Sequence, residues 1–536
     1  MMDTGTLNFL WSQALVAGFV AAGTTHAVIS PGSRSTPLAL AMLRQPGLKC
    51  TVAVDERSAA FFALGIAKAS RLPVLLLATS GTAPANWLPA VIEASQSGIP
   101  LILISADRPP ELQGVGANQT IDQSALFGPH VRASHAPGTP VENFDFGYLH
   151  RLAARICEQA TWPHPGPVHI NQPFREPLLP AGETPAPSPL EKLVVSRAPL
   201  PPDPNDIRNL AGRIAARPGI IVCGEMPAEA GFAEAVGALA ARLNSPVLAE
   251  PLSNLRFGGH DRSHLCVRYN VWLNDPQARH ASRPEWVLRF GTFPVTRRLQ
   301  ELVGSGNGLQ AQVEPWPQWA DPLHQVTHVL RADPVAFCGA LLAEAPQPAP
   351  ASWQAGFALH DAHVPRNSGG HIPVLIDDLP AGTAVFVGNS LAIRELDSHS
   401  GSADKALFFY GNRGASGIDG NISTAMGIAA VHGRVVALLG DLTCQHDLGG
   451  LALAQGRDAV IVAVNNRGGG IFEHLPQAAL PEFEQGWRTP QRIDFEHAAL
   501  TFGLDFAKAD DDDAFRKALR RALDAGGPHL IERRLA

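Results

Sequence analysis

The sequence predicts an α/β protein built from three doubly wound domains, each with a parallel β-sheet. Short, continuous apolar runs recur along the 536 residues, separated by Ala/Leu-rich segments of helical character. Each run ends in or next to a small or polar residue, as strands buried on both faces of a parallel sheet do. The runs are "PVLLLATSG", "IPLILISADRP", "GIIVCGEM", "TAVFVGNS", "RVVALLGD" and "DAVIVAVNN". A chain of this length also exceeds what one ordinary hydrophobic core supports.

Proline-rich linkers divide the chain into three parts. "LLPAGETPAPSPLEKL" and "RAPLPPDPND" follow one another closely, and "EAPQPAPASW" lies near residue 350. We therefore expect domains at residues 1–185, 196–346 and 354–536. In each domain, ligands are expected at the carboxyl ends of the strands, because that edge of a doubly wound sheet carries the loops that bind them.

The composition argues against several classes of protein. A net charge of -7, without a block of Lys or Arg, disfavours a nucleic-acid-binding surface. The six cysteines are scattered without a C-x-x-C pair, which favours a reducing compartment and disfavours structural zinc. No run of about 18 apolar residues predicts a membrane span, and no basic residue precedes the first apolar segment as in a signal peptide. We expect a cytoplasmic protein without nucleic-acid or membrane partners.

"AVISPGSRSTPLALAM", residues 27–42, is typical of a strand, a Pro-Gly turn and a helix start. Arg34 would then lie near the helix N-terminus, where free N–H groups favour an anion and a guanidinium adds a planar pair of donors. This segment alone is equally compatible with an anion site and with a capped helix that carries a solvated arginine.

Two neighbouring apolar runs in the last third end in oxygen ligands. One run ends at Asp441 and the next at Asn465 and Asn466, with a helical stretch between them. A right-handed crossover places both strand ends at one edge of the sheet. A carboxylate, an amide and a backbone carbonyl at the glycines 468–470 suit a Mg²⁺ ion that also binds a diphosphate. The alternative is that Asp441 and Asn466 only cap two strands.

Glu56, in "CTVAVDERSAAFFALGIAKAS", lies between a β run and a small apolar helix. A carboxylate there is costly unless it has a partner, although an acid at a helix N-terminus is also common.

Together, Asp441, Asn466 and Glu56 resemble the two half-sites of thiamine-diphosphate-dependent enzymes. The pair Asp441 and Asn466 is similar to the GDG…NN signature of that superfamily, with Leu442 in place of its second glycine. The resemblance implies the three-domain fold of these enzymes, with an N-terminal pyrimidine-binding, a central structural or regulatory and a C-terminal diphosphate-binding domain. It also implies thiamine diphosphate with Mg²⁺ or Mn²⁺ as cofactors, and an obligate homodimer or homotetramer in which Glu56 faces N1′ of the aminopyrimidine.

Longer blocks resemble one family within that superfamily, the 2-succinyl-5-enolpyruvyl-6-hydroxy-3-cyclohexene-1-carboxylate synthases of menaquinone biosynthesis. The blocks are "SPGSRSTPLALA", "DERSAAFFALG", "TSGTAPAN", "ISADRPPEL", "GANQTIDQ", "GNSLAIRELD", "NRGASGIDGNISTAMG" and "NNRGGGIF". They run from residue 30 to about 475, and the middle domain matches more weakly. The resemblance implies a transferase that decarboxylates 2-oxoglutarate and adds the succinyl unit to isochorismate in a 1,4-addition.

Arginines in the loops at the predicted ligand edge suit these dicarboxylate substrates, since an acidic protein needs local positive charge to bind them. Each of these arginines could also be solvated or structural. With the residues that the resemblance adds, the expected substrate site is Ser33, Arg34, Arg108, Asn118, Gln119, Arg297, Ser390, Arg394, Arg413 and Phe472. Arg297 stands where family members often carry lysine. The expected cofactor site is Glu56, Ser390, Ile418, Asp441, Leu442, Asn466, Gly468 and Ile471, with Asp441, Asn466 and Gly468 on the metal.

Two other functions fit parts of the sequence. One is a different thiamine-diphosphate enzyme, such as an acetohydroxyacid synthase or a 2-oxoacid decarboxylase, which acts on pyruvate and needs fewer arginines. The other is a non-catalytic protein that binds a nucleotide or diphosphate, but "GIIVCGEMPAEAG" in the middle domain lacks G-x-G-x-x-G.

His446 and His474 lie near the cofactor blocks without a motif for acid–base catalysis. The acids 510–513 are expected to begin a helix whose later turns are basic.

Overall fold

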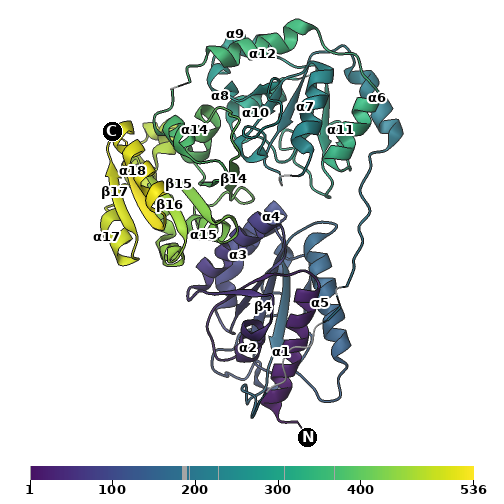
Figure 1. The fold of residues 1–536 in the computed structure, drawn as a ribbon, viewed down its shortest axis with the longest axis vertical. Helices are drawn as coiled ribbons and strands as arrows, with labels where there is room; N and C mark the ends of the chain where they lie inside the picture. The colour runs from purple at the N-terminus through teal and green to yellow at the C-terminus, as the bar shows by residue number, and fades with distance from the viewer. Residues whose placement is uncertain are drawn as a thin grey trace.

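The structure is a computed structural model with three parallel six-stranded sheets, which confirms the predicted fold class (Figure 1). It describes residues 2–183, 190–191, 193–226, 229–306, 308–366 and 368–535. Part of the first expected linker, residues 184–189 and 192, lies outside the described residues.

The first sheet has the strand order β2-β1-β3-β4-β6-β5. Side chains alternate along β3: Val74 and Leu76 face α3 and α4, whereas Leu75 and Leu77 face α1, α2 and α5. The strands are β1 (His26–Ile29), β2 (Lys49–Val52), β3 (Val74–Ala78), β4 (Leu101–Asp107), β5 (Ser134–His135) and β6 (Val168–Pro173). The helices are α1 (Thr4–Ala21), α2 (Thr36–Arg44), α3 (Glu56–Ser70), α4 (Leu88–Ser97) and α5 (Phe146–Thr161).

The third sheet, β14-β13-β15-β16-β18-β17, repeats the first: counted from its own first strand, each has the order 2-1-3-4-6-5. Its strands are β13 (Ala384–Val387), β14 (Phe408–Gly411), β15 (Arg434–Gly440), β16 (Asp458–Asn465), β17 (Asp505–Ala509) and β18 (Pro528–Arg534). Its helices are α13 (His371–Asp378), α14 (Leu391–His399), α15 (Asn421–His432), α16 (Asp441–His446), α17 (Phe495–Thr501) and α18 (Asp512–Ala525). The acidic run begins α18 as predicted, with Asp511 as its N-cap.

The middle sheet differs, with the order β12-β11-β10-β7-β8-β9, which is the 3-2-1-4-5-6 order of dinucleotide-binding folds. Its strands are β7 (Gly219–Cys223), β8 (Val247–Ala249), β9 (Leu265–Cys266), β10 (Trp286–Phe290), β11 (Leu309–Val313) and β12 (His328–Leu330). The helices around it are α6 (Pro204–Ile214), α7 (Phe232–Leu243), α8 (Tyr269–Trp272), α9 (Pro276–Ala281), α10 (Arg297–Gly304), α11 (Pro334–Ala343) and α12 (Ala351–His363).

Helix α12 lies largely in the segment where we expect the third domain to begin, yet it packs on the middle domain. The Trp353 indole donates to the Gly219 carbonyl of β7 (2.8 Å), and Phe357 packs against Trp272.

The short helical turns are η1 (Pro84–Trp87), η2 (Pro110–Leu112), η3 (Gly128–His130), η4 (Pro251–Ser253), η5 (Leu448–Ala454), η6 (Gly470–His474), η7 (Pro476–Ala479) and the π-turn η8 (Glu484–Arg488). Among the described helices, none is long and apolar enough to cross a membrane.

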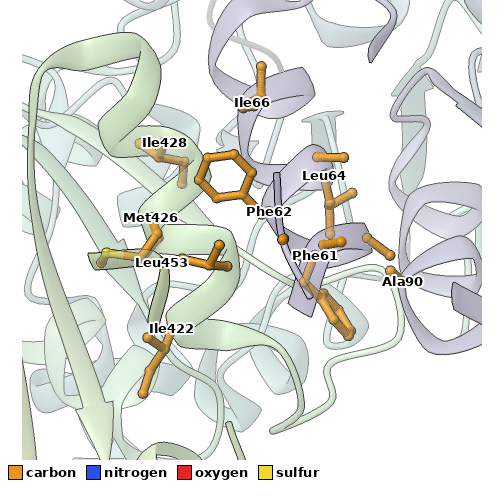
Figure 2. Packing of buried hydrophobic residues seen from close by; sticks show 14 of the residues in the cluster. Phe61, Phe62, Leu64, Ile66, Ala90, Ile422, Met426, Ile428 and Leu453 are labelled. Carbon is orange, nitrogen blue, oxygen red and sulfur yellow. The ribbon is translucent and has the colours of Figure 1, made fainter. Parts of the chain in front are cut away.

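Helices α3 and α15 join the first and third domains through one continuous core. Phe61 and Phe62 of α3 belong to the same buried cluster as Ile422 and Met426 of α15 (Figure 2). Two glycines allow the helices to approach this closely. A Cβ on Gly65 would lie 2.0 Å from the Thr424 carbonyl oxygen, and one on Gly427 would lie 2.1 Å from that of Phe62. The two backbones are therefore in direct contact.

We predict that Gly65→Ala lowers the midpoint of thermal unfolding by at least about 4 °C, because the added methyl group must push α3 away from α15. Differential scanning calorimetry measures this shift. The control is Gly339→Ala in α11, where nothing lies within 4 Å of the added Cβ; it should leave the midpoint unchanged or raise it, since Ala favours a helix over Gly. Equal midpoints for both variants would contradict the role given to Gly65.

Candidate active site

Asp441 and Asn466 lie together at the carboxyl edge of the third sheet, as predicted. Strands β15 and β16 are parallel neighbours, with Gly440 opposite Val464. The Asp441 carboxylate accepts hydrogen bonds from the backbone N–H of Gly468 (2.7 Å) and of Leu442 (2.9 Å). The carboxylate thus holds the loop that follows Asn466 against the start of α16.

The donor set at this edge fits a hard divalent cation. The Asn466 Oδ1 is buried and has no hydrogen-bond partner among the described residues, and burial raises the pKa of Asp441. A carboxylate and an amide oxygen in such a place are stabilised by a cation that both can bind. No group of three or more His, Cys, Asp or Glu side chains that could hold a metal occurs in the described part of the chain, so a metal here relies on amide and backbone oxygens as well.

Gly468 allows the tight loop beside Asp441. Its φ of +116° is one that L side chains rarely adopt, and a Cβ would lie 2.1 Å from the Arg488 carbonyl oxygen. Arg488 also donates from its guanidinium to the Asn466 carbonyl and to Glu473. Leu442 and Ile471, the other residues expected to contact the cofactor here, are partly buried on α16 and η6.

Glu56 is the first residue of α3 and is partly buried. Asp55 caps the helix by accepting from the Ser58 N–H (3.0 Å). The next side chain, Arg57, donates to the carbonyl of His446 (3.3 Å) and lies 3.9 Å from the buried Asp447 carboxylate. The α3–α15 packing therefore places the start of α3 against the segment between α16 and η5 of the same chain.

Arg34 and Arg108 are neighbours at the carboxyl edge of the first sheet. Arg34 precedes α2, as predicted, and is 6% exposed. It donates to the Phe174 carbonyl (3.0 Å) and pairs with the mostly exposed Glu176 (2.8 Å). Arg108 donates to the Ser80 hydroxyl, and its pKa is lowered by burial and by the charge of Arg34. Two like charges this close favour an anion between them.

Gln119 completes this arginine cluster, whereas two other expected residues lie at its margin. The Gln119 amide donates to the Ser80 carbonyl (2.9 Å). Ser33 and Asn118 are exposed on the turn before α2 and on the loop after β4. Gln119 is itself exposed but is linked to Arg108 through Ser80, whereas no hydrogen bond joins Ser33 or Asn118 to the two arginines within the described residues.

A network of hydrogen-bonded polar side chains on β4 and β6 holds the backbone at Arg108. Asp107 accepts from the backbone N–H of Arg108 (2.7 Å) and from the Asn171 amide (2.8 Å). The Asn171 oxygen accepts from the Ser105 hydroxyl (2.9 Å), which lies 2.8 Å from His169 Nε2. Burial lowers the pKa of His169 to about 4, so the ring is neutral near pH 7.

A second arginine cluster lies at the carboxyl edge of the third sheet. Arg394 donates to the carbonyl of Ser390 (2.7 Å), and burial together with the charge of Arg413 lowers the pKa of Arg394. Arg413 donates to the side chain of Asn389, whose amide in turn donates to the Gly417 carbonyl (2.6 Å). Ser390 has φ +67° and ψ −124°, a backbone conformation that non-glycine residues rarely adopt.

The remaining expected residues do not join these clusters. The Arg297 side chain is 86% exposed and pairs with Glu301 on its own helix, α10. Ile418 is 37% exposed on the loop before α15, and Phe472 is partly buried on η6. His446 and His474 are both exposed.

Sequence reasoning missed Asn389 and Arg488. Asn389 ends the run "TAVFVGNS", so its position after a buried strand was an available signal. Arg488 reaches Asn466 from a π-turn that no local pattern predicts.

Two family models match the first and the third domain. Residues 11–126 match the family model described as thiamine pyrophosphate enzyme, N-terminal TPP binding domain, and residues 401–533 match the corresponding C-terminal TPP binding domain. The chain is 65% identical to a 2-succinyl-5-enolpyruvyl-6-hydroxy-3-cyclohexene-1-carboxylate synthase of Dechloromonas aromatica (strain RCB), over 100% of both chains. It is 41% identical to the enzyme of the same name from Geobacillus kaustophilus (strain HTA426), over 98% of this chain and 94% of that one.

Among solved structures, the fold is similar to that of benzoylformate decarboxylase from Polynucleobacter necessarius. The TM-score is 0.73 over 98% of each chain, at 18% identity. At that identity the likeness concerns the fold alone.

We predict that the protein loses stability at acid pH, because the folded chain keeps His169 neutral while the unfolded chain can protonate it. The pKa of His169 is about 4 in the folded chain and about 6.5 when unfolded. His169 therefore leaves the free energy of unfolding at its full value above pH 6.5. As the pH decreases towards 4 this free energy falls, by about 2 kcal/mol at pH 5. Urea unfolding at pH 7 and pH 5 measures the loss, and His169→Gln should lose about 2 kcal/mol less than the wild type between these values. An equal loss in both proteins would show that His169 is not the group responsible.

Proposed function

The chain belongs to the 2-succinyl-5-enolpyruvyl-6-hydroxy-3-cyclohexene-1-carboxylate synthase family of thiamine-diphosphate-dependent enzymes, and from this premise we propose its reaction and the roles of its residues. The reaction consumes 2-oxoglutarate and isochorismate and releases CO₂ and 2-succinyl-5-enolpyruvyl-6-hydroxy-3-cyclohexene-1-carboxylate, a step of menaquinone biosynthesis. The observation that carries this proposal is the pair of arginine clusters at two sheet edges, because both substrates are dicarboxylates.

The diphosphate end of the cofactor is held at the third sheet. Asp441 and Asn466 bind Mg²⁺ with their side chains, and the Gly468 segment contributes a backbone oxygen. The buried, unpartnered Asn466 oxygen and the raised pKa of Asp441 support this assignment. Mn²⁺ is an alternative, since it also prefers oxygen ligands. Leu442 and Ile471 line the same loops, and Ser390 and Ile418 line the part of the site that contacts the organic portion of the cofactor.

Bound thiamine diphosphate supplies an electron sink for cleavage of the bond to the departing carboxyl group. Glu56 would hold a proton at N1′ of the aminopyrimidine when the cofactor is bound. Its partly buried position at the start of α3 suits a hydrogen bond between the carboxyl group and such a ring nitrogen.

The arginines bind and orient the substrate carboxylates. Arg34 and Arg108, with Ser33, Asn118 and Gln119, form one subsite at the first sheet. Arg394 and Arg413, with Ser390, form the other at the third sheet, and Phe472 provides an apolar wall. Glu176 pairs with Arg34, so a substrate carboxylate that binds Arg34 competes with that of Glu176. Arg297 contributes from the middle domain once its exposed side chain leaves Glu301.

We infer that the active protein is a homodimer or homotetramer in which one chain completes the site of another. Val54, two residues before Glu56, is 82% exposed, and Ile418 is 37% exposed. A site for an aromatic cofactor needs such side chains covered and water excluded. A second copy of the chain supplies that cover, as the family resemblance implies.

The free cysteines indicate a reducing compartment. All six are free, and five of them are buried. We propose that the protein acts in the cytoplasm, where free thiols persist.

The proposed reaction is tested by product identification. The protein with thiamine diphosphate and Mg²⁺ is expected to convert 2-oxoglutarate and isochorismate into CO₂ and a product of the expected mass, and to be inactive when either the cofactor or the metal is omitted. Turnover of pyruvate without isochorismate would instead indicate an acetohydroxyacid synthase or a 2-oxoacid decarboxylase.

In the same assay, Glu56→Gln should lower kcat by at least about 100-fold, because the amide cannot share the proton. Its affinity for thiamine diphosphate, measured by calorimetry, should remain close to that of the wild type. Glu234→Gln is the matched control, since Glu234 is also an acid in the first turn of a helix, α7, but is exposed on the middle domain. A full rate with Glu56→Gln would refute the role of Glu56.

A further inference from the structure

A buried carboxylate, Glu93, stands where all three domains meet. It belongs to α4 of the first domain, and its side chain is 3% exposed. Lys68 of α3 approaches it from the same domain, Glu225 approaches Lys68 from the segment after β7, and the loop after β14 approaches from the third domain. In Figure 1, α3 and α4 lie next to α15 and below the middle domain.

Both oxygens of Glu93 bind the loop of the third domain. The backbone N–H of Gly414 donates to Oε1 (2.9 Å), and that of Ala415 donates to Oε2 (2.7 Å). The Ser97 hydroxyl donates to Oε1 (2.8 Å), which orients the carboxylate from within α4. Hydrogen bonds from backbone amides to an ionised carboxylate are among the stronger ones in proteins.

Lys68 provides the compensating charge. Its ammonium lies 3.6 Å from both Glu93 and Glu225 and donates to the Gly411 carbonyl (2.5 Å). Burial alone would raise the pKa of Glu93, but Lys68 and the two loop amides lower it below its usual value. Glu93 is therefore ionised at neutral pH and remains a double acceptor.

The loop that Glu93 holds carries Arg413 at one end and Ile418 at the other. Gly414 is pressed against α4 so closely that a Cβ there would lie 2.6 Å from the Glu93 carbonyl oxygen. On its other side the loop is fixed by Asn389, which binds Arg413 and the Gly417 carbonyl. The guanidinium of Arg413 thus depends on two anchors, one from its own sheet and one from the first domain.

We propose that Glu93 is a positioning residue, whose carboxylate fixes the backbone at Gly414 and Ala415 and thereby sets the affinity of the Arg413 subsite for its carboxylated substrate. This inference rests on the proposed function for the identity of the substrate. The hydrogen bonds from Glu93 to the loop lie within the chain and are tested without substrate.

Glu225→Gln is the matched control for Glu93→Gln. Both substitutions remove a carboxylate 3.6 Å from Lys68, and the charge of Glu225 also acts on Arg413. Glu225 accepts no hydrogen bond from the loop in the described structure, so this control removes a carboxyl group next to Lys68 and leaves the two backbone bonds in place.

Hydrogen–deuterium exchange of the full, ligand-free chain tests the hold on the loop. In Glu93→Gln one loop N–H faces an amide N–H₂ group instead of an acceptor, so a peptide covering residues 411–420 should exchange about ten-fold faster than in the wild type. Glu225→Gln should exchange at the wild-type rate. Unchanged exchange in Glu93→Gln would overturn the inference, whatever the activity.

Kinetics of the enzyme with thiamine diphosphate and Mg²⁺ test the consequence. Arg413→Ala first identifies which of the two substrates Arg413 binds, as the one whose KM increases. Glu93→Gln should raise the KM of that same substrate about ten-fold, with kcat changed by less than about three-fold. Glu225→Gln should raise that KM much less than Glu93→Gln does, because it leaves the two backbone bonds to the loop in place. A fall in kcat with both KM values unchanged would overturn the positioning role, because a merely destabilised protein loses active molecules without changing KM.

A second variant covers the case in which Glu93→Gln does not fold. Glu93→Asp keeps the charge facing Lys68 but shortens the side chain by one methylene, so it cannot bind both amides in the same geometry. It should show faster exchange and a raised KM in the same direction, and a folded Glu93→Asp with neither change would overturn the inference. A wild type that forms no product would refute the proposed function alone, and the exchange experiment would still decide whether Glu93 holds the loop.

Discussion

The direct backbone contact between α3 and α15 is the constraint on which the site depends. Only glycine at positions 65 and 427 permits it, and the packed side chains around the contact merge the cores of the first and third domains. Because α3 begins at Glu56 and α15 follows the loop with Arg413 and Ile418, the crossing fixes how one chain holds its two half-sites, each of which another chain completes. Packing energy far from the chemistry thus defines the geometry in which the chemistry takes place.

Local charge, and not net charge, gives this acidic protein its capacity for dicarboxylates. The two arginine clusters lie at the carboxyl edges of the first and third sheets, which have the same strand order. Buried polar groups support each cluster: Asp107 and Asn171 below Arg108, and Asn389 with Glu93 around the Arg413 loop. A guanidinium held in this way loses little side-chain entropy when it binds a carboxylate, which is what an orienting group requires.

Local patterns predicted the elements of the fold well, because strands buried on both faces need continuous apolar runs. "RVVALLGD" and "DAVIVAVNN" form β15 and β16, and their ends bring Asp441 to the loop after Asn466. Contacts between distant segments were not predictable. Glu93 stands in an apolar helical stretch, and its partners at Gly414 and Ala415 lie more than 300 positions away. The packing of α12 on the middle sheet and the exposure of Arg297 likewise depend on how the domains meet.

A site shared between chains requires that Glu56 of one chain and Asp441 of another bind the same cofactor. Co-expression of a Glu56→Gln chain and an Asp441→Ala chain with different affinity tags allows the mixed dimer to be isolated. Each such dimer then contains one site with both carboxylates intact, so its activity should be about half that of the wild type, although either variant alone is inactive. A mixed dimer as inactive as its parents would contradict a site shared between chains.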